Sequence, residues 1–221
     1  REVERGHLGV VAGGLGALEG FVVHLVQVRE NPLAVTGHAG GLEDVGGEPG
    51  RRVAAALFFH MYVWTVSAGA ICAYVTERRV PEVAADNIVV EFDGRGMGSG
   101  IAVLAPRFAA LRDDPARGDP DVSLVSSDED LARWLHERLV SGHLEAVAGA
   151  IRKQALLGWP ILWGLAADTC AEAFVRAARA LPDDPRALDT GRMFLAYAGS
   201  PLGGRTTLLA REHGGRRRLY Y

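Results

Sequence analysis

Cysteine is scarce in this sequence. The 221 residues include 2 cysteines, Cys72 and Cys170, and they form no C-x-x-C motif. Two isolated thiols exclude a disulfide framework and a zinc site built on paired thiolates. This low cysteine content is typical of proteins from a reducing compartment, so we expect a cytoplasmic location.

Lysine is almost absent, and positive charge is not in excess. Lys153 is the only lysine among the 24 Lys and Arg residues, and the formal net charge is -3. A chain without an overall basic field is not expected to attract the phosphate backbone of DNA or RNA. We therefore expect no nucleic-acid partner.

A signal-peptide pattern is also missing from the start of the sequence, which begins at Arg1. One charge-free run, residues 53–75, is long enough to span a bilayer as a helix. Polar residues interrupt this run, and an arginine pair flanks it at each end, so it shows no positive-inside asymmetry. We therefore expect a buried central helix and no transmembrane span.

The chain is large and apolar enough to bury a substantial core, since 48% of its residues are hydrophobic. We expect a single domain over residues 1–221. Within it, a helical N-terminal subdomain (1–80) is expected to pack on an α+β part (81–221). No pattern in the sequence indicates an oligomeric state.

Hydrophobic periodicity predicts helices over residues 8–28, 51–78, 126–151 and 160–182. Ser126 and Glu129 have the spacing of a capping box at the start of the third helix. Short β-branched runs predict a hairpin of residues 87–91 and 101–104, and further strands over 122–125 and 206–211. The glycines at 94–100 belong to the hairpin turn, because no G-K-[ST] follows them.

Three stretches resemble the FhuF-like ferric iron reductase family. The first is a long Ala-rich helix followed by a Pro-containing link, an Asn and a strand, AALFFHMYVWTVSAGAICAYVTERRVPEVAADNIVVEFDGRG. The second, GWPILWGLAADTCAEAF, has the Trp-Gly and Asp that recur in the family before an apolar helix. The third ends the chain, TTLLAREHGGRRRLYY. The three stretches follow the family's order and cover about half of the chain.

The resemblance implies an α+β fold in which helices pack on a small antiparallel sheet, related to the C-terminal part of the siderophore synthetases. It also implies an association with iron–siderophore complexes. Hydroxamate and catecholate ligands hold Fe(III) far better than Fe(II), so delivering one electron loosens the complex. If this activity is retained, the protein is an oxidoreductase.

The family's redox cofactor is a [2Fe-2S] cluster held by a Cys-Cys pair and a later Cys-x-x-Cys. In this sequence Arg217 and Arg218 stand at the positions of the Cys-Cys pair. Neither four thiolates nor a set of two thiolates and two histidines exists at this end of the chain. We expect a divergent member that has lost the cluster; a truncated chain and residues missing within it are the alternatives. Haem or another iron centre remains open as a cofactor.

Arg216, Arg217 and Arg218 are the first candidates for ligand binding. Guanidinium forks match carboxylates bidentately, so these arginines suit an anionic siderophore or a carboxylate. The alternative is a solvated, frayed basic tail. Trp163 and Asp168 are predicted to line a pocket, with a structural, hydrogen-bonded Asp168 as the alternative.

His60 lies in the middle of an apolar helical run and is the candidate metal ligand, for haem or non-haem iron. The alternative is a histidine that is hydrogen-bonded inside the core. Cys170 is predicted to be a small core residue. His136 and His143 are seven residues apart and fit one helix face, without a visible third ligand.

Two functions follow from these observations. The first is an iron–siderophore-associated protein, in siderophore handling or a neighbouring biosynthetic pathway, with redox chemistry on a borrowed centre such as haem and with His60 as its ligand. The alternative is a non-catalytic binding protein, in which the arginines and the Trp163–Asp168 pocket hold a siderophore or another small anionic ligand.

Overall fold

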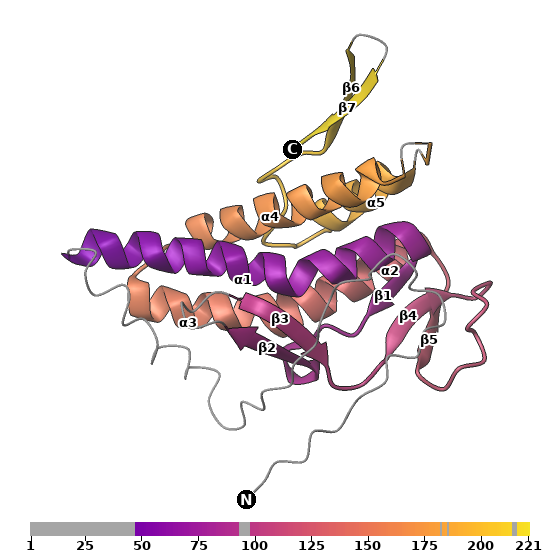
Figure 1. Cartoon of the computed structure of the whole chain (residues 1–221), viewed down its shortest axis with the longest axis horizontal. Coiled ribbons are helices and arrows are strands. Elements are labelled where there is room, and N and C mark those ends of the chain that lie inside the picture. The colour runs from indigo at the N-terminus through magenta and orange to yellow at the C-terminus, as the bar shows by residue number, and fades with distance from the viewer. Residues whose placement is uncertain (1–46, 93–97, 182, 185, 214–215) are drawn as a thin grey trace, which may run out of the picture.

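A computed structural model describes residues 47–92, 98–181, 183–184, 186–213 and 216–221. Its longest element is α1 (Gly47–Glu77), which runs across the width of the molecule in Figure 1. The predicted helix over residues 8–28 lies outside the described residues, and so does most of the proposed N-terminal subdomain. The charge-free run of residues 53–75 lies entirely within α1.

The core is formed mainly between α1 and α4 (Trp159–Arg179), which pack along one another. Pro160 occupies the first turn of α4, where a missing amide hydrogen costs nothing. Small residues of α4 such as Ala166 and Ala171 are fully buried, so the two helices can approach closely. The largest fully buried side chains of this core come from α1, α2, η3, α4, α5 and the turn after α5: Phe59, Ile71, Tyr74, Leu131, Leu135, Leu139, Leu144, Leu162, Phe174, Leu188, Phe194 and Leu202.

The predicted helix of residues 126–151 consists of three consecutive elements. They are α2 (Asp128–Leu135), a π-helix η3 (His136–Leu144) and α3 (Glu145–Ala155). The expected capping box is displaced by one residue: Ser127 Oγ accepts the amide of Asp130 at 3.1 Å, and the Asp130 carboxylate accepts the amide of Ser126 at 3.1 Å. Ser126 and Glu129 are therefore not the capping pair, because Ser127 is the last residue with extended backbone.

The strands form three small sheets in the described part of the chain, so the molecule is of the α+β class, as expected. In the first sheet β4 (Phe108–Leu111) lies between β1 (Arg79–Pro81) and β5 (Val122–Val125). The β1–β4 pair is antiparallel, whereas β4 and β5 are parallel, so this sheet is mixed. The second sheet is the predicted hairpin, β2 (Ile88–Phe92) with β3 (Gly98–Val103), preceded by a short 3-10 turn, η2 (Ala85–Asn87).

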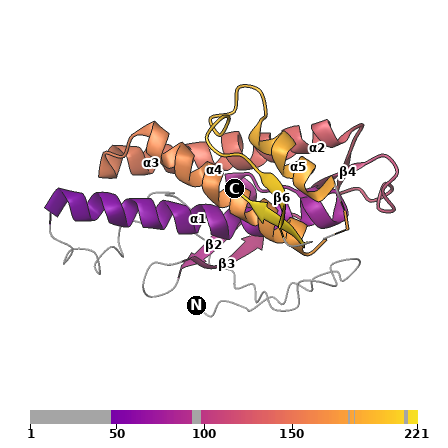
Figure 2. The same cartoon turned by 90° about the horizontal axis from the view of Figure 1, so that it is seen from above.

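The third sheet is the C-terminal hairpin, β6 (Leu209–His213) with β7 (Arg216–Tyr220). It follows α5 (Arg186–Leu195), which packs on α4. In Figures 1 and 2 this hairpin leaves the α4–α5 layer and projects from the body of the molecule, on the side of α4 opposite to α3. The predicted strand over 206–211 thus begins at Leu209, and the basic C-terminal segment forms its partner strand.

Candidate functional site

His60 lies on the face of α1 that meets α4, where one of its ring nitrogens is held by Thr169. The Thr169 hydroxyl lies 2.7 Å from the carbonyl oxygen of Leu165 and 2.9 Å from Nδ1 of His60. A carbonyl oxygen only accepts, so the single hydroxyl hydrogen goes to Leu165 and the hydroxyl oxygen accepts from His60 Nδ1–H. In the neutral tautomer that makes this hydrogen bond, Nε2 of the half-buried imidazole is the nitrogen that has a lone pair for a ligand.

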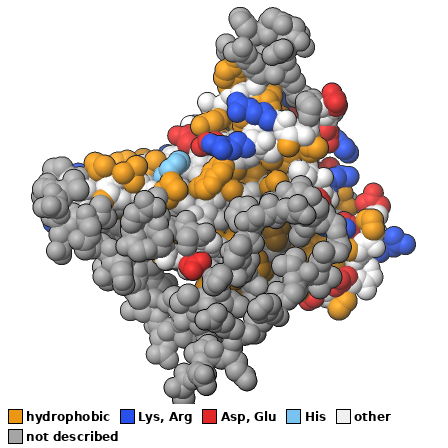
Figure 3. All heavy atoms as spheres, viewed as in Figure 1, with side chains coloured by type: hydrophobic (Ala, Val, Ile, Leu, Met, Phe, Trp, Pro, Cys, Tyr) orange, Lys and Arg blue, Asp and Glu red, His pale blue; other side chains and the backbone are white. Residues whose placement is uncertain are grey.

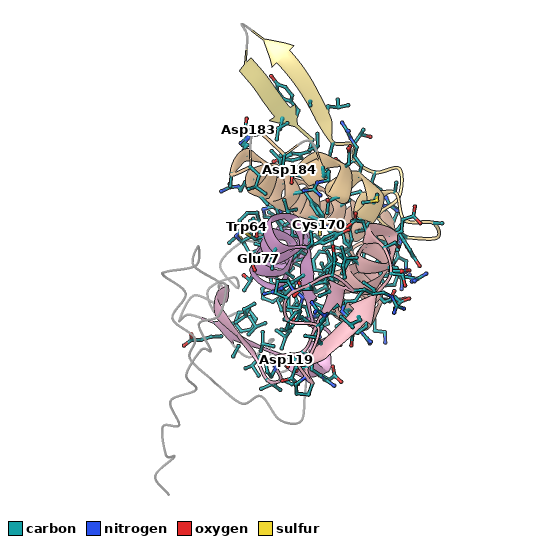
Figure 4. The ribbon with its side chains drawn as sticks, turned by 90° about the vertical axis from the view of Figure 1, so that its right-hand side faces the viewer. Trp64, Glu77, Asp119, Cys170, Asp183 and Asp184 are labelled. Atoms are coloured by element: carbon teal, nitrogen blue, oxygen red, sulfur yellow. The ribbon has the colours of Figure 1, made fainter. Side chains whose placement is uncertain are left out.

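One turn further along α1, Trp64 lies beneath a guanidinium group of α4. Arg176 Cζ is 4.9 Å from the centre of a Trp64 ring, a cation–π distance, and Arg176 Nη2 pairs with Glu172 at 2.5 Å. Figure 4 shows Trp64 beside α1 and Cys170 between α1 and α4. The surface next to His60 therefore combines an aromatic ring with a charge pair.

Trp163 and Asp168 lie on different sides of α4 and differ in exposure. Trp163 is 6% exposed and stacks on Trp159, with ring centres 5.7 Å apart and an interplanar angle of 7°. Asp168 is exposed on a different side of the helix, since five residues of an α-helix correspond to about 500° of rotation. Trp163 is part of the core, and Asp168 is exposed, so it is not a buried structural carboxylate.

The two other histidines considered, His136 and His143, are both buried but contact different elements. His143 Nδ1 donates to the carbonyl of Val83 at 2.8 Å, and the hydroxyl of Tyr62 donates to its Nε2 at 2.7 Å. His136 stacks on Tyr197, with ring centres 4.5 Å apart. The two histidines do not form a shared ligand set. The π-helix has i→i+5 hydrogen bonds and more residues per turn than an α-helix, so residues seven apart do not return to the same face.

The described residues do not fit a [2Fe-2S] cluster. They contain no group of three or more His, Cys, Asp or Glu side chains placed to hold a metal ion. Cys170 is completely buried, and burial raises the pKa of its thiol to about 12, so it remains protonated at neutral pH. The thiol faces Ser67 Oγ, which has no nitrogen or oxygen partner. Cys170 is a core residue, as its sequence pattern predicted.

The arginines near the C-terminus lie in β7, and the register of the hairpin divides them between its two faces. Arg218 is directly opposite Arg211, and Arg216 is directly opposite His213. Residues two apart on a strand share a face, so these four positions lie on one face of the hairpin, together with Leu209 and Tyr220. Arg217 lies on the other face, opposite Glu212.

We call Arg211, His213, Arg216 and Arg218 the basic face of the hairpin. The sequence prediction named Arg216 and Arg218, and the register of the hairpin places Arg211 and His213 on the same face. The sequence signal for the hairpin was present in Gly214-Gly215, a dipeptide that commonly joins two strands of a hairpin. The backbone of residues 216–220 forms strand β7.

The hairpin joins the body near the C-terminal end of α4. Leu219 is 8% exposed, and its carbonyl accepts a hydrogen bond from Arg179 Nη2 at 3.1 Å. Trp163 lies sixteen residues before Arg179, about 24 Å along the helix axis at 1.5 Å per residue. The hairpin therefore attaches at the C-terminal end of α4, whereas Trp163 lies near the N-terminal end of that helix and Asp168 near its middle.

A family model described as ferric iron reductase FhuF-like transporter matches residues 56–217. The matched region runs from the first half of α1 to the second residue of β7, and so includes His60, Thr169 and most of the hairpin. No curated protein and no solved structure matches the chain.

Proposed function

The chain belongs to the FhuF-like ferric iron reductase family, and on this basis we propose that its C-terminal hairpin binds anionic ferric-siderophore complexes. Membership of the family supports an iron–siderophore-related function in general terms. The finer proposal rests on one observation. The register of β6 and β7 gives one face of the hairpin four basic residues and no acidic residue.

The chemistry of this face suits an anionic iron chelate. Like charges directly opposite each other destabilise an antiparallel pair, so the Arg211–Arg218 pairing favours an anion that neutralises both. Guanidinium groups donate paired hydrogen bonds to oxyanions such as the catecholate oxygens around Fe(III). Leu209 and Tyr220, exposed by 41% and 43%, lie at the base of the same face and offer apolar contact to the organic part of the ligand.

The basic face also includes part of the segment where the family pattern has its cysteine pair, since Arg217 and Arg218 replace that pair. The described residues do not provide a cluster at this position, and the proposal is limited to binding. We propose that this binding takes place in the cytoplasm.

The experiment is a titration of the full chain with a ferric tris-catecholate complex, followed by quenching of tryptophan fluorescence. We expect the Arg216→Ala/Arg218→Ala double variant to lose roughly 10- to 100-fold in affinity, because the two lost hydrogen bonds each contribute on the order of 1 kcal/mol net. Affinity is expected to fall as salt is added, because exposed charges are screened.

Arg217→Ala is the matched control, because Arg217 is in the same strand but on the face opposite Glu212. It is expected to retain most of the affinity, and the neutral ferric tris-hydroxamate complex is expected to bind more weakly than the anionic catecholate. Equal losses for Arg217→Ala and for the double variant, or no binding of either complex, would contradict the proposal.

Ligation of an iron centre by Nε2 of His60 is a second candidate, favoured by the hydrogen bond that fixes the other ring nitrogen on Thr169. His60 would hold haem iron as a single protein ligand, and haem would supply one-electron redox chemistry there. The chain's own contribution is to orient the imidazole: Thr169 keeps the proton on Nδ1.

Titration of the full chain with haem tests this candidate. We expect a shifted Soret band that disappears in His60→Gln and weakens in Thr169→Val, which removes the partner of Nδ1. A Soret band that is unchanged in His60→Gln would show that another group binds the haem and would end this candidate.

A further inference from the structure

One end of the molecule exposes several large apolar side chains. Val53 and Leu57, in the first turns of α1, are exposed by 59% and 61%. Leu156, which follows α3, is exposed by 65%, and Ile161, at the start of α4, by 46%. The beginning of α1, the end of α3 and the beginning of α4 lie together at the left-hand end of Figures 1 and 2. Figure 3 shows hydrophobic side chains along this end.

Four basic side chains lie at the same end, two on α1 and two on α3. Arg51 and Arg52 on α1 and Arg152 and Lys153 on α3 are exposed. None of the four forms an ion pair with a described residue, and Arg152 lies 5.5 Å above a ring of Trp159. Residues 50–57 and 152–161 include no Asp or Glu. We call these eight side chains, four apolar and four basic, the basic apolar end.

The stability of the fold does not explain why residue 156 is a leucine. It caps α3 in the left-handed region, with φ of 52°, a conformation in which glycine is the usual residue and a side chain adds strain. Burial of its side chain offsets little of that strain, because Leu156 is the most exposed large apolar residue of the described part of the chain. A strained and exposed leucine indicates a surface that is covered by something else.

α1 is also long and apolar enough to cross a membrane, by length and composition, over Gly50–Glu77, and 33% of its most apolar window is buried. Its second half is not available to lipid, because Val66, Ile71 and Tyr74 are fully buried and the helix continues directly into strand β1. The exposed large apolar side chains of α1, Val53 and Leu57, both lie in its first three turns. The geometry therefore suits contact with a bilayer surface and not a span.

We propose that the basic apolar end docks on the surface of a membrane that contains anionic lipids. The four basic side chains suit lipid phosphate groups, and the four apolar side chains suit the boundary between headgroups and acyl chains. Charge complementarity favours this occupant over a second copy of the chain, because two copies would bring their basic residues together. The proposal is independent of the ligand bound by the hairpin.

The test is co-sedimentation of the full chain with vesicles. We expect binding to vesicles of phosphatidylcholine with 30% phosphatidylglycerol, as a chosen probe composition, and little binding to phosphatidylcholine alone. Arg51→Gln/Arg52→Gln is expected to lower the partition coefficient roughly 10- to 30-fold, and high salt should have a similar effect. Leu57→Ser is expected to weaken binding to the same anionic vesicles.

Leu156→Gly separates membrane binding from folding. Glycine relieves the left-handed strain, so the melting temperature is expected to stay the same or rise while vesicle binding falls. Leu124→Ser is the matched control: Leu124 is 41% exposed, but it lies on β5 at the other end of the molecule. Its vesicle binding should equal that of the unaltered chain.

Three results would overturn the proposal. The first is no binding of the full chain to anionic vesicles. The second is binding that Arg51→Gln/Arg52→Gln and Leu156→Gly leave unchanged. The third is a dimer in light scattering that Leu57→Ser dissociates, together with a lack of vesicle binding, which would assign this end to a second copy of the chain.

Discussion

Asn87 uses both polar atoms of its buried side chain to join the link after β1 to the end of β3. Its Nδ2 donates to the carbonyls of Glu82 at 2.8 Å and Ala105 at 3.1 Å, and its Oδ1 accepts the amide of Ala105 at 2.9 Å. The residue is 3% exposed, so water cannot replace these partners. The Asn that follows the long helix in the family pattern therefore has a structural role in this chain.

Replacing Asn87 by Ala is expected to lower the free energy of unfolding by about 2–4 kcal/mol, because it leaves buried backbone groups without partners. Urea denaturation monitored by circular dichroism measures this loss. Asp86→Ala, at the exposed neighbouring position, is the control and should change the midpoint little. A midpoint for Asn87→Ala equal to that of the control would contradict the assignment.

His136 makes stability depend on pH. Burial lowers the pKa of His136 below the value of about 6.5 that it has in the unfolded chain, and burial lowers that of His143 as well. The unfolded state therefore binds more protons as pH falls below about 6.5, and stability present at neutral pH is lost as pH falls through the folded pKa.

His136→Phe is expected to reduce the difference in unfolding free energy between pH 7 and pH 5. Phenylalanine can keep the stacking on Tyr197 and has no proton to gain. It also removes the buried Nε2 that has no hydrogen-bond partner. Urea midpoints at the two pH values give the comparison, and an unchanged acid sensitivity would show that His136 is not responsible.

At the scale of elements, Gly191 allows α5 to pack closely on α4 and on the segment before β6. A Cβ atom at this position would lie 2.5 Å from Leu208 Cδ1 and 2.8 Å from Phe174 Cγ. Gly191→Ala is therefore expected to destabilise the protein by about 1–3 kcal/mol, despite the higher helix propensity of alanine. Thermal or urea denaturation provides the measurement.

Gly164 in α4 is the matched control, because a Cβ atom there would meet no heavy atom within 4 Å outside the backbone of its own helix. Gly164→Ala should stabilise the protein by up to about 1 kcal/mol through helix propensity alone. If both substitutions changed stability in the same direction, the close approach at Gly191 would not be the cause.

The helices could be predicted from the sequence because their apolar residues recur at helical spacing, as in the stripe from Leu131 to Ile151. The π-helix within that stripe could not be predicted. A change from i→i+4 to i→i+5 hydrogen bonds does not alter which residues of the sequence are apolar. The one-residue shift of the capping box has a similar origin: Ser126 and Ser127 both fit the motif, and only backbone geometry selects Ser127.

Strand pairing was the least predictable feature. The β2–β3 hairpin could be predicted from two β-branched runs close together in the sequence. The parallel pairing of β4 with β5 depends on the path that the chain takes through residues 112–121. For the candidate site, the sequence identified His60 and the terminal arginines. It did not identify Thr169 or the partners of the arginines, because those depend on helix packing and strand register.

At the scale of the whole molecule, the packing of α1 on α4 makes the thiol of Cys170 less accessible to solvent than that of Cys72. Cys170 is completely buried, with its pKa raised by burial to about 12, whereas Cys72 is half-buried. A thiol reagent is expected to modify Cys72 in the native protein, and to modify Cys170 only as the molecule unfolds.

The Cys72→Ser variant retains Cys170 as the only thiol, so the rate at which a thiol reagent reacts with it reports on Cys170 alone. Its rate of modification should follow the population of unfolded protein as urea is added. Rapid modification of this variant without denaturant would show that the contact between α1 and α4 opens locally.

The cross-strand register of the C-terminal hairpin implies a trade-off between stability and function. A chain shaped by stability alone would place a carboxylate opposite Arg211, as it does opposite Arg217, since opposite charges across strands attract. The register places Arg218 there instead. Evolution toward a more stable protein would therefore have an easy route, a single change to Glu at residue 218, and that route would remove the proposed anion site.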